Sequence, residues 1–364
     1  MNILLVITGL EVGGAERQVI DIADELISHG HKVTIAYFLG TARLRPKKNE
    51  VKLVELGSGK KNIWAFLFGF LSLISLIKAL KPDVVHAHMF HAIIISRLIR
   101  IFIRIPRLIC TSHSSYDGGR LRMLCYRITS YFGDEFTNVS QKAVDQLEDR
   151  GAAKKGSMLA ILNGININNF SYSSEKRYFI RQDFFESTQI LLSVGRFHKA
   201  KDYPNLLQAF FLICKVRSDV ELWIAGDGPL KKEMVALIKS LGLERKVKLL
   251  GIRDDIPYLM NAADIYVLSS AWEGFGLVVA EAMATERVVV ATDCGGVREV
   301  VGDCGFLVPA SDSILLSDAL NDALRLNNKS RVKLGKSARL RIKEHYSINV
   351  TVQKWLDIYI GRPN

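Results

Sequence analysis

The stretch DIYVLSSAWEGFGLVVAEAM, residues 264–283, predicts a buried strand that passes through a glycine loop into a helix. The apolar run IYVL has the length of a strand, and the helix is expected to begin near Gly276. Its first N–H groups would favour a phosphate, because the helix dipole is positive at that end. Glu273 and Glu281 place a carboxylate on each side of the loop, where each can accept hydrogen bonds from sugar hydroxyls.

Strand-like and helix-like segments alternate along the whole chain, which predicts an α/β fold with parallel sheets covered on both faces. A first series contains Asn2–Ile7, Lys32–Phe38, Val84–His86 and Arg107–Thr111. A second series contains Ile190–Val194, Glu221–Ala225, Val247–Leu250, Ile265–Leu268 and Val288–Ala291. Each series opens with its own strand and loop, so two doubly wound domains are predicted.

The chain length also favours two domains, because 364 residues are about twice the usual single-domain size. The polar, turn-rich segment Asn163–Ser174 (NGININNFSYSS) lies between the two series and is expected to be the hinge. In open parallel sheets, ligands bind outside the carboxyl ends of the strands. We therefore expect the ligand in a cleft where the two domains face each other.

The charge and the cysteines exclude several classes of protein. The formal net charge is +12, which indicates an anionic partner. No nucleic-acid motif is evident, so that partner is expected to be a phosphorylated small molecule, a membrane surface, or both. The five cysteines form no C-x-x-C pair, which argues against a disulfide framework or a zinc site. The N-terminal MNILLVITGL lacks a basic region and is expected to be a strand, not a signal peptide.

Two apolar stretches of the first domain raise the question of membrane contact. Asn62–Ile77 has about 16 residues, fewer than the roughly 20 that span a bilayer, and is expected to be a buried helix. In Ile93–Arg107 four arginines recur every three or four residues, which predicts one basic helical face. These arginines are Arg97, Arg100, Arg104 and Arg107. Such a helix suits a membrane interface, and a solvated surface helix is the alternative.

Further candidate residues follow other strands. Gly195-Arg196 comes directly after Ile190–Val194, and Lys201 follows soon after. Two cations at the carboxyl end of a strand can neutralise a diphosphate, although surface cations are common in so basic a chain. The turns GDGP (226–229) and TDCGG (292–296) offer glycines that would let a ligand approach the backbone, and a plain turn also explains GDGP.

Histidines follow two strands of the first series. His86 and His88 could pass for metal ligands, but no third ligand stands at suitable spacing, so no metal site is expected. His88 and His91 are interpreted as cleft or acceptor-side residues. His113 lies in TSHSS, after the strand Arg107–Thr111.

Taken in order, these motifs form the pattern NG–GR–K–GDGP–EGFG–E. They are Asn163-Gly164, Gly195-Arg196, Lys201, Gly226-Asp227-Gly228-Pro229, Glu273 and Glu281, with seven residues between the two acids. The ordered set resembles the retaining glycosyltransferases of family 4, which have the GT-B fold, and it covers nearly the whole chain. GGAER, Gly13–Arg17, also looks like that family. Two acids seven residues apart are a weak signal alone, whereas the ordered set is specific.

The resemblance implies roles for the matching positions of the second domain. Arg196 and Lys201 would bind the donor's diphosphate, and Glu273 would contact the transferred sugar. The amides of Gly274, Phe275, Gly276 and Leu277 would hold phosphate and sugar. Glu281 would accept hydrogen bonds from the ribose hydroxyls, and Asp255-Ile256 would lie near the nucleobase.

In the first domain the resemblance implies that Gly13-Gly14 approach the donor phosphate or the acceptor. His113 matches the family's active-site histidine beside the sugar, so the implied catalytic set is His113, Arg196, Lys201 and Glu273. The implied division is an acceptor-side Rossmann-like domain 1–165, a nucleotide-sugar-binding Rossmann-like domain 166–345, and a C-terminal helix 346–364 that returns to the first domain.

The resemblance further implies a retaining transfer without cofactor or metal. No carboxylate can be named as a nucleophile, so front-face attack is expected, with a phosphate oxygen of the leaving group helping to deprotonate the acceptor. The donor is expected to be a UDP-hexose or UDP-N-acetylhexosamine first and GDP-mannose second. The acceptor is expected to be a saccharide or a lipid-linked sugar of bacterial polysaccharide or lipopolysaccharide synthesis, which places the protein in the cytoplasm, peripheral on the inner membrane.

Three alternatives remain open at the level of sequence. A dinucleotide-dependent oxidoreductase lacks support, because G-x-G-x-x-G is absent and no acid follows the second strand. A nucleotide-sugar epimerase or a phosphorylase would keep the fold and change the chemistry. A non-catalytic scaffold that binds nucleotide sugar would not need Glu273.

Overall fold

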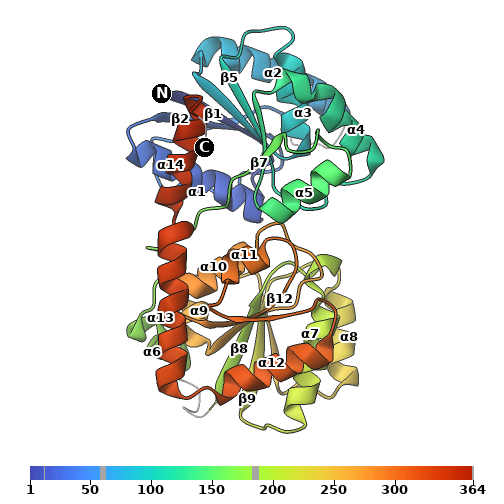
Figure 1. Cartoon of the computed structure of the whole chain (residues 1–364), viewed down its shortest axis with the longest axis vertical. Helices are drawn as coiled ribbons and strands as arrows, with labels where there is room; N and C mark the ends of the chain where they lie inside the picture. Colours follow the sequence, from blue (N-terminus) through green and yellow to red (C-terminus); the bar gives the residue numbers. More distant parts are fainter. Residues whose placement is uncertain (12, 58–62, 183–187, 363–364) are drawn as a thin grey trace. The chain divides into compact units, whose positions relative to one another are not determined.

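The computed structural model describes residues 1–11, 13–57, 63–182 and 188–362, and its chain divides into two compact units. Unit 1 comprises Met1–Gly164 together with Ile348–Asn364, and unit 2 comprises Ile165–Ser347. The sequence had placed the divisions after residues 165 and 345. Each unit is an α/β structure around its own parallel sheet (Figure 1).

Unit 1 is built on a seven-stranded parallel sheet in the order β3-β2-β1-β4-β5-β6-β7. The strands are β1 (Asn2–Gly9), β2 (Lys32–Leu39), β3 (Lys52–Glu55), β4 (Val84–His88), β5 (Arg107–Ser112), β6 (Glu135–Asn138) and β7 (Met158–Ala160). The order reverses between β1 and β4, and the carboxyl ends of strands flanking such a point are where open sheets bind ligands.

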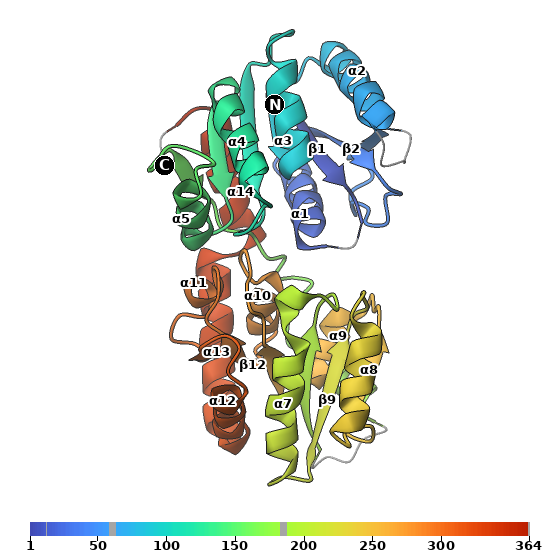
Figure 2. The same ribbon diagram turned by 90° about the vertical axis from the view of Figure 1, so that its right-hand side faces the viewer.

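The side chains of β1 alternate between two cores. Ile3, Leu5 and Ile7 face one side, where α1 (Gly14–Ser28) and α14 (Ile348–Tyr359) pack. Leu4 and Val6 face the other side, which is covered by α2 (Ile63–Leu80), α3 (Phe90–Ile99), α4 (Arg120–Thr129) and α5 (Gln141–Asp149). Figure 2 shows α2, α3 and α4 together on this second side. The segment Ser130–Phe132 forms a 3-10 turn, η1.

Unit 2 is built on a six-stranded parallel sheet in the order β10-β9-β8-β11-β12-β13. The strands are β8 (Gln189–Val194), β9 (Val220–Ala225), β10 (Val247–Gly251), β11 (Ile265–Leu268), β12 (Val288–Thr292) and β13 (Phe306–Val308). The helices are α6 (Ser174–Arg181), η2 (Lys199–Lys201), α7 (Tyr203–Cys214), α8 (Lys231–Ser240), α9 (Ile256–Ala262), α10 (Leu277–Ala284), α11 (Val297–Val301), α12 (Ser313–Arg325) and α13 (Asn328–His345).

The predicted strands are confirmed with small changes at their ends, and the predicted α/β class is confirmed in both units. Predicted strand 265–268 matches β11 at both ends, and the helix predicted near Gly276 begins at Leu277. The sequence did not predict β3, β6, β7 and β13, which have three or four residues each and therefore carry little periodic signal.

The prediction of one basic helical face over Ile93–Arg107 is wrong. Helix α3 ends at Ile99, so most of those arginines lie beyond it. Arg97 is fully buried and donates to the carbonyl of Tyr126. Arg100 pairs with Asp134 at 2.9 Å, and Arg107 pairs with Glu135 at 3.1 Å. These arginines hold α3 and β5 to the elements around them, because buried guanidinium groups require partners.

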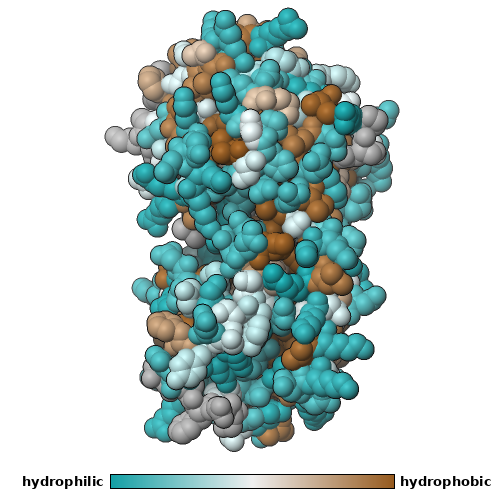
Figure 3. Space-filling model, turned by 90° about the vertical axis from the view of Figure 1, so that its left-hand side faces the viewer, coloured by the Kyte–Doolittle hydropathy of each residue, from teal (hydrophilic) through white to brown (hydrophobic). Residues whose placement is uncertain are grey.

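The stretch Asn62–Ile77 forms most of α2, although Asn62 lies outside the described residues. One side of this helix packs on the sheet through the buried Leu73 and Ile77, as predicted. The other side exposes Leu67, Phe68 and Leu71, each more than half accessible. Among the described residues, no helix combines the length and apolarity needed to cross a bilayer. The face that carries α1 and α14, by contrast, is mostly hydrophilic (Figure 3, upper half).

Candidate functional site

An ion pair between Lys201 and Glu273 joins two loops at the carboxyl ends of neighbouring strands of unit 2. Lys201 ends η2, after β8, and Glu273 lies in the loop after β11. The Lys201 Nζ lies 2.5 Å from the Glu273 Oε1, and both side chains are about four-fifths buried. The structure therefore brings together two residues that the sequence singled out separately, 72 positions apart.

Two serines that the sequence analysis missed position this pair. The Ser270 hydroxyl donates to the Glu273 Oε1 at 2.7 Å, and the Ser269 hydroxyl donates to the Lys201 carbonyl at 2.8 Å. The N–H of Ala271 donates to the carbonyl of Ala200 at 2.8 Å. These bonds fix one loop against the other, so the carboxylate is held in place before any ligand binds. The signal was present as the SS dipeptide directly after β11.

The glycines of GDGP and TDCGG serve loop packing. A Cβ on Gly226 would lie 2.0 Å from the carbonyl oxygen of Gly195, and one on Gly228 would lie 2.5 Å from that of Phe197. A Cβ on Gly295, whose φ is +54°, would lie 1.8 Å from the carbonyl oxygen of Glu273. At these three positions a glycine is required because the backbones of neighbouring loops touch, and the approach of a ligand to these turns stays a prediction.

The start of α10 has the form that the sequence predicted. Gly276 precedes the helix with φ +87°, a left-handed conformation that favours glycine. The N–H groups of Val279 and Ala280 donate to the Gly276 carbonyl, whereas those of Leu277 and Val278 have no carbonyl of the helix to bond and can serve an anion. Glu281 is 6% exposed and lies in the second turn. The Phe275 ring is buried and faces Tyr346, so only the backbone of Phe275 remains for a ligand.

The remaining predicted residues of unit 2 lie at the same edge of the sheet, where β8, β10 and β12 end. Arg196 is exposed, and no hydrogen bond or ion pair of its side chain is found among the described residues. Asp255 precedes α9, which begins at Ile256, and its carboxylate pairs with Arg253 at 2.5 Å. Asp293, after β12, pairs with Arg298. Arg196 therefore adds an exposed cation to this loop, next to Gly195, which packs against the Lys201 side chain.

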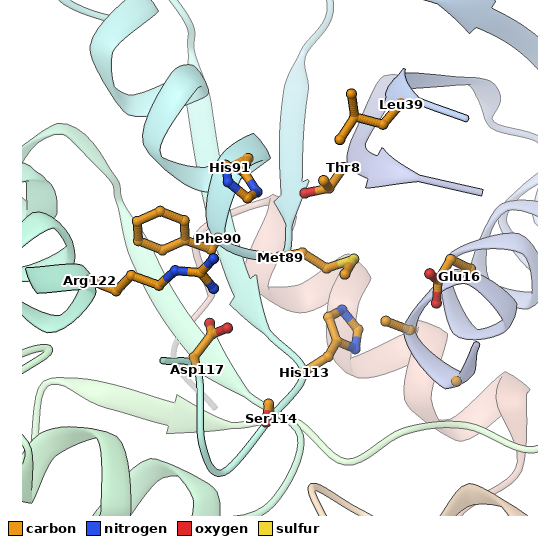
Figure 4. A pocket seen from close by; sticks show the side chains of 12 residues that line it. Thr8, Glu16, Leu39, Met89, Phe90, His91, His113, Ser114, Asp117 and Arg122 are labelled. Atoms are coloured by element: carbon orange, nitrogen blue, oxygen red, sulfur yellow. The ribbon is translucent and has the colours of Figure 1, made fainter. Parts of the chain in front are cut away.

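Unit 1 contains a pocket of about 580 Å³ at the carboxyl ends of its strands (Figure 4). Predicted residues Gly14, His91 and His113 line it, whereas Gly13 does not. Ala15 and Glu16 of the GGAER motif and Ser114 of TSHSS also line it. The sequence did not predict the remaining lining residues, Thr8, Leu39, Met89, Phe90, Asp117 and Arg122. The lining combines two carboxyl groups, a guanidinium group and two imidazoles, which suits a hydroxyl-rich ligand.

The charged groups of the pocket are held by their surroundings. Asp117 accepts hydrogen bonds from the hydroxyls of Ser112, at 3.1 Å, and Tyr126. The Arg122 guanidinium stacks on the Phe90 ring, 4.6 Å from its centroid. Burial raises the pKa of Glu16 above its ordinary value. Met89 has φ +71°, an uncommon conformation for a non-glycine residue and one that occurs at functional sites.

The histidines of β4 lie behind this pocket, in the interior of unit 1. His86 and His88 are fully buried, so the interpretation of His88 as a cleft residue is wrong, while His91 does line the pocket. The His88 Nδ1 lies 3.0 Å from the His113 Nε2. Within the part of the chain that the structure describes, no cluster of three metal-binding side chains occurs.

Burial lowers the pKa of three histidines in unit 1, His86, His88 and His113, the last to about 4. Unfolded histidines have a pKa near 6.5, so below that pH the unfolded chain binds more protons than the folded one. The contribution of these neutral histidines to the free energy of unfolding is therefore fully present above about pH 6.5. It is lost as the pH falls toward about 4. Asp21 has the opposite effect, because burial raises its pKa to about 6 and its protonation on acidification therefore stabilises the folded chain. It is one group against three histidines.

We therefore expect the melting temperature to fall as the pH is lowered from about 6.5 to about 4.5. A His88→Asn/His113→Asn variant should show a shallower decline, because two of the three histidines no longer take up a proton on unfolding. Calorimetry over this pH range measures both slopes. Equal slopes for the two proteins would contradict the assignment.

Two family models match the chain and together cover most of it. The model for glycosyltransferase family 4 matches residues 12–169, and the model for glycosyl transferases group 1 matches residues 174–341. The first lies within unit 1 and the first few residues of unit 2, and the second lies within unit 2.

Curated relatives are named as enzymes that transfer sugars. An N-acetyl-alpha-D-glucosaminyl L-malate synthase of Bacillus anthracis is 31% identical over 200 residues, and the chain spans only about half of its length (52% of each chain). A Campylobacter jejuni protein is 26% identical over 370 residues, 98% of each chain. It is named a GalNAc-alpha-(1->4)-GalNAc-alpha-(1->3)-diNAcBac-PP-undecaprenol alpha-1,4-N-acetyl-D-galactosaminyltransferase.

Among solved structures, HepE of Anabaena in complex with UDP and glucose superimposes with a TM-score of 0.86. It is 23% identical, and the match covers 98% of this chain and 99% of that one. At this identity the likeness establishes the fold alone, and the fold is the one that the sequence motifs predicted.

Proposed function

Because the chain belongs to glycosyltransferase family 4, with the GT-B fold, we propose that it moves a hexose or N-acetylhexosamine from a nucleotide diphosphate sugar to a saccharide or lipid-linked acceptor. UDP-sugars are favoured as donors and GDP-mannose is second. The acceptor class follows the relatives, some of which are named for diphospho-undecaprenol substrates. The pathway we propose is the synthesis of a bacterial polysaccharide or lipopolysaccharide.

The observation that carries this proposal is the buried contact of Lys201 with Glu273 beside the exposed Arg196. A carboxylate held by Lys201 and Ser270 can accept a hydrogen bond from the transferred sugar without having to be ordered first. The cations at the same edge can neutralise the negative charge that develops on the departing nucleotide diphosphate.

We assign the other donor contacts to the loops around this pair. The amides of Gly274, Phe275, Gly276 and Leu277 would bind the phosphate and the sugar, because they lie at the start of α10. Glu281 would accept hydrogen bonds from the ribose. Asp255 and Ile256 would lie near the base, with the Asp255 carboxylate engaged by Arg253.

In unit 1 we assign the pocket to the acceptor. About 580 Å³ falls in the range of small-molecule sites, and its hydrogen-bonding groups suit sugar hydroxyls. His113 stands on its wall, and the glycine loop at Gly13-Gly14 adjoins it. Since burial keeps the pKa of His113 near 4, its imidazole is neutral at physiological pH and acts as a hydrogen-bonding group, not as an acid.

We propose retention at the anomeric carbon through front-face attack. The bond from the anomeric carbon to the diphosphate oxygen breaks, and the acceptor oxygen bonds to the same face. The acceptor proton passes to a phosphate oxygen of the leaving group, so no protein nucleophile is needed. Neutralisation by Arg196 and Lys201 would serve in place of a metal ion.

Product analysis tests the proposed activity. The protein is incubated in EDTA with UDP-hexoses, UDP-N-acetylhexosamines or GDP-mannose and with saccharides linked to a polyprenyl diphosphate. Mass spectrometry should show one sugar added to the acceptor, and NMR of the product should show the anomeric configuration of the donor. An isomerised donor sugar would favour an epimerase, an inverted linkage would overturn the mechanism, and absence of any turnover would favour a binding scaffold.

We also propose that unit 1 contacts the cytoplasmic face of a membrane through helix α4. Leu121, Leu124 and Ile128 are each more than half exposed on this helix, and Arg120 and Arg127 accompany them. Exposed apolar side chains with cations on one helix fit an anionic lipid surface. The Phe102 side chain, 69% exposed, lies against Phe70 of α2 and extends the apolar area toward that helix.

A Leu124→Glu/Ile128→Glu variant should bind vesicles of phosphatidylglycerol and phosphatidylethanolamine about tenfold or more weakly than the parent protein. The two side chains would lose their apolar contact with lipid, and the added charge would be repelled. Vesicle flotation measures this. The matched control is Val216→Glu/Val235→Glu, which changes two exposed apolar residues of unit 2 and should leave binding unchanged. Equal loss in both variants would exclude α4 as the contact.

A further inference from the structure

A chain of buried hydrogen bonds with a defined direction runs through the sheet of unit 1. The Thr137 hydroxyl donates to the Cys110 carbonyl, which can only accept. We assign the Thr137 proton to this 3.4 Å contact, so that Thr137 accepts from Thr111, at 2.7 Å, and Thr111 accepts from the His86 Nε2, also at 2.7 Å. This leaves the His86 Nδ1 to accept from the Tyr359 hydroxyl of α14, at 2.7 Å. The neutral His86 thus carries its proton on Nε2.

His86 in turn supports His88, and His88 contacts His113. The rings of His86 and His88 are tilted by 36° with centroids 3.9 Å apart, and the ring of Trp355 of α14 lies 4.5 Å from that of His86. Between the His88 Nδ1 and the His113 Nε2, at 3.0 Å, there is room for one proton. Both rings are neutral, because burial lowers the pKa of each. One of the two nitrogens therefore donates and the other accepts.

The two outer nitrogens of this pair distinguish the two possible arrangements. The His88 Nε2 and the His113 Nδ1 are both buried and have no hydrogen-bond partner among the described residues. If His113 donated to His88, the remaining proton of His88 would be an unpaired N–H in the core, which is rare and costly. If His88 donates, the unpaired N–H is the His113 Nδ1, which is also buried in the unliganded chain but belongs to a residue that lines the pocket, where a ligand oxygen can pair it (Figure 4).

We propose that His88 fixes the proton of His113 on Nδ1, so that His113 presents an N–H donor to an oxygen of the ligand in the pocket of unit 1. A sugar hydroxyl or a phosphate oxygen supplies such an acceptor. His88 does not touch the ligand in this scheme and is a positioning residue, held from behind by His86. The consequence for sugar transfer rests on the proposed function, whereas the position of the protons does not.

The proton positions can be measured directly. In protein labelled with ¹⁵N-histidine, long-range proton–nitrogen correlations distinguish protonated from bare ring nitrogens, and single His→Asn variants assign the signals. We expect Nε2–H for His86, Nδ1–H for His88 and Nδ1–H for His113 at neutral pH. His113 protonated on Nε2, with Nδ1 bare, would overturn the proposal whether or not the protein has transferase activity.

Two pairs of variants test the consequence for transfer. His88→Asn keeps an amide N–H near the position of Nδ1, whereas His88→Leu has similar bulk and no donor. We expect kcat/KM to fall about 10- to 100-fold in His88→Leu and to be largely restored in His88→Asn, because a misplaced His113 costs orientation. Similarly, His113→Asn, which can donate near Nδ1, should keep more activity than His113→Gln, which donates near Nε2.

The controls separate this proposal from the proposed function. Nucleotide affinity, which we assign to unit 2, should be unchanged in all four variants. If the parent protein transfers sugar and His88→Leu matches it, His88 has no positioning role. If His88→Leu does not fold, the activities of His113→Asn and His113→Gln still test the proposal. Greater activity of His113→Gln than of His113→Asn would overturn the assignment of the proton to Nδ1. Absence of transfer by the parent protein would refute the proposed function and leave the NMR result intact.

Discussion

Replacement of Glu273 by glutamine is expected to lower kcat for sugar transfer by about 10²- to 10³-fold without weakening nucleotide binding. The Glu273 Oε1 accepts from both Lys201 and Ser270 in a site that is mostly closed to water. Glutamine keeps the size of the side chain and can keep the bond to Ser270. It removes the charge that holds Lys201 and that we propose faces the transferred sugar, so an interaction proposed for the transition state is lost.

Initial rates and calorimetric titration with nucleotide measure the two parts of this prediction. Glu244→Gln is a matched control, because Glu244 is an exposed carboxylate of the same unit and should tolerate the change. Weaker nucleotide binding in Glu273→Gln would show that Glu273 acts on the nucleotide. An unchanged rate would remove Glu273 from the mechanism and favour the scaffold alternative.

The largest expected effect on stability is at Asp264, at the start of β11. This carboxylate is 6% exposed and accepts from Arg177 at 2.6 Å, from Arg181 at 2.9 Å and from the Ile190 N–H at 2.8 Å. Burial alone would raise its pKa, but the two arginines hold the pKa of Asp264 below its ordinary value. The carboxylate joins α6 to the sheet next to the strand that leads to Glu273.

Asp264→Ala is therefore expected to lower the free energy of unfolding of unit 2 by about 3–5 kcal/mol, since it leaves the guanidinium groups buried without their counter-charge. Denaturant titration followed by fluorescence reports on this unit when Trp64 and Trp355 of unit 1 are replaced by phenylalanine, so that only Trp223 and Trp272 emit. Asp322→Ala provides the comparison, because Asp322 pairs with Arg325 on an exposed surface and should cost at most about 1 kcal/mol. Similar losses in both variants would show that the buried cluster contributes little.

The parts of the fold with a strong local signal could be predicted from the sequence. The apolar strands of the two sheets give continuous runs, and Gly276 marks the start of α10 because a left-handed residue is needed there. The arginines of Ile93–Arg107 gave a misleading signal, since their spacing of three and four residues matches a helix. The buried partners of Arg97 and the acids that pair with Arg100 and Arg107 lie about 30 residues away, so spacing alone could not reveal them.

The candidate site shows the same division. The motifs that hold Arg196, Lys201 and Glu273 can be recognised in the sequence, because each lies in the loop that follows an apolar strand. The contact between Lys201 and Glu273 depends on β8 and β11 being neighbours, which follows from the sheet order and not from local pattern. The role of Gly295, which packs on the carbonyl of Glu273, and the link from Tyr359 to His86 also arise only in the folded chain.

The central claim, that Arg196 and Lys201 bind a nucleotide diphosphate without metal, is tested most directly by calorimetric titration with UDP, GDP and ADP in EDTA. We predict that one nucleotide binds and that Arg196→Ala/Lys201→Ala weakens it about 100-fold, the loss of two charge-assisted contacts. Lys232→Ala/Lys239→Ala removes two exposed cations of α8 and should bind like the parent protein. Binding of none of the three nucleotides by the folded protein, or equal binding by the parent and the Arg196→Ala/Lys201→Ala variant, would contradict the account.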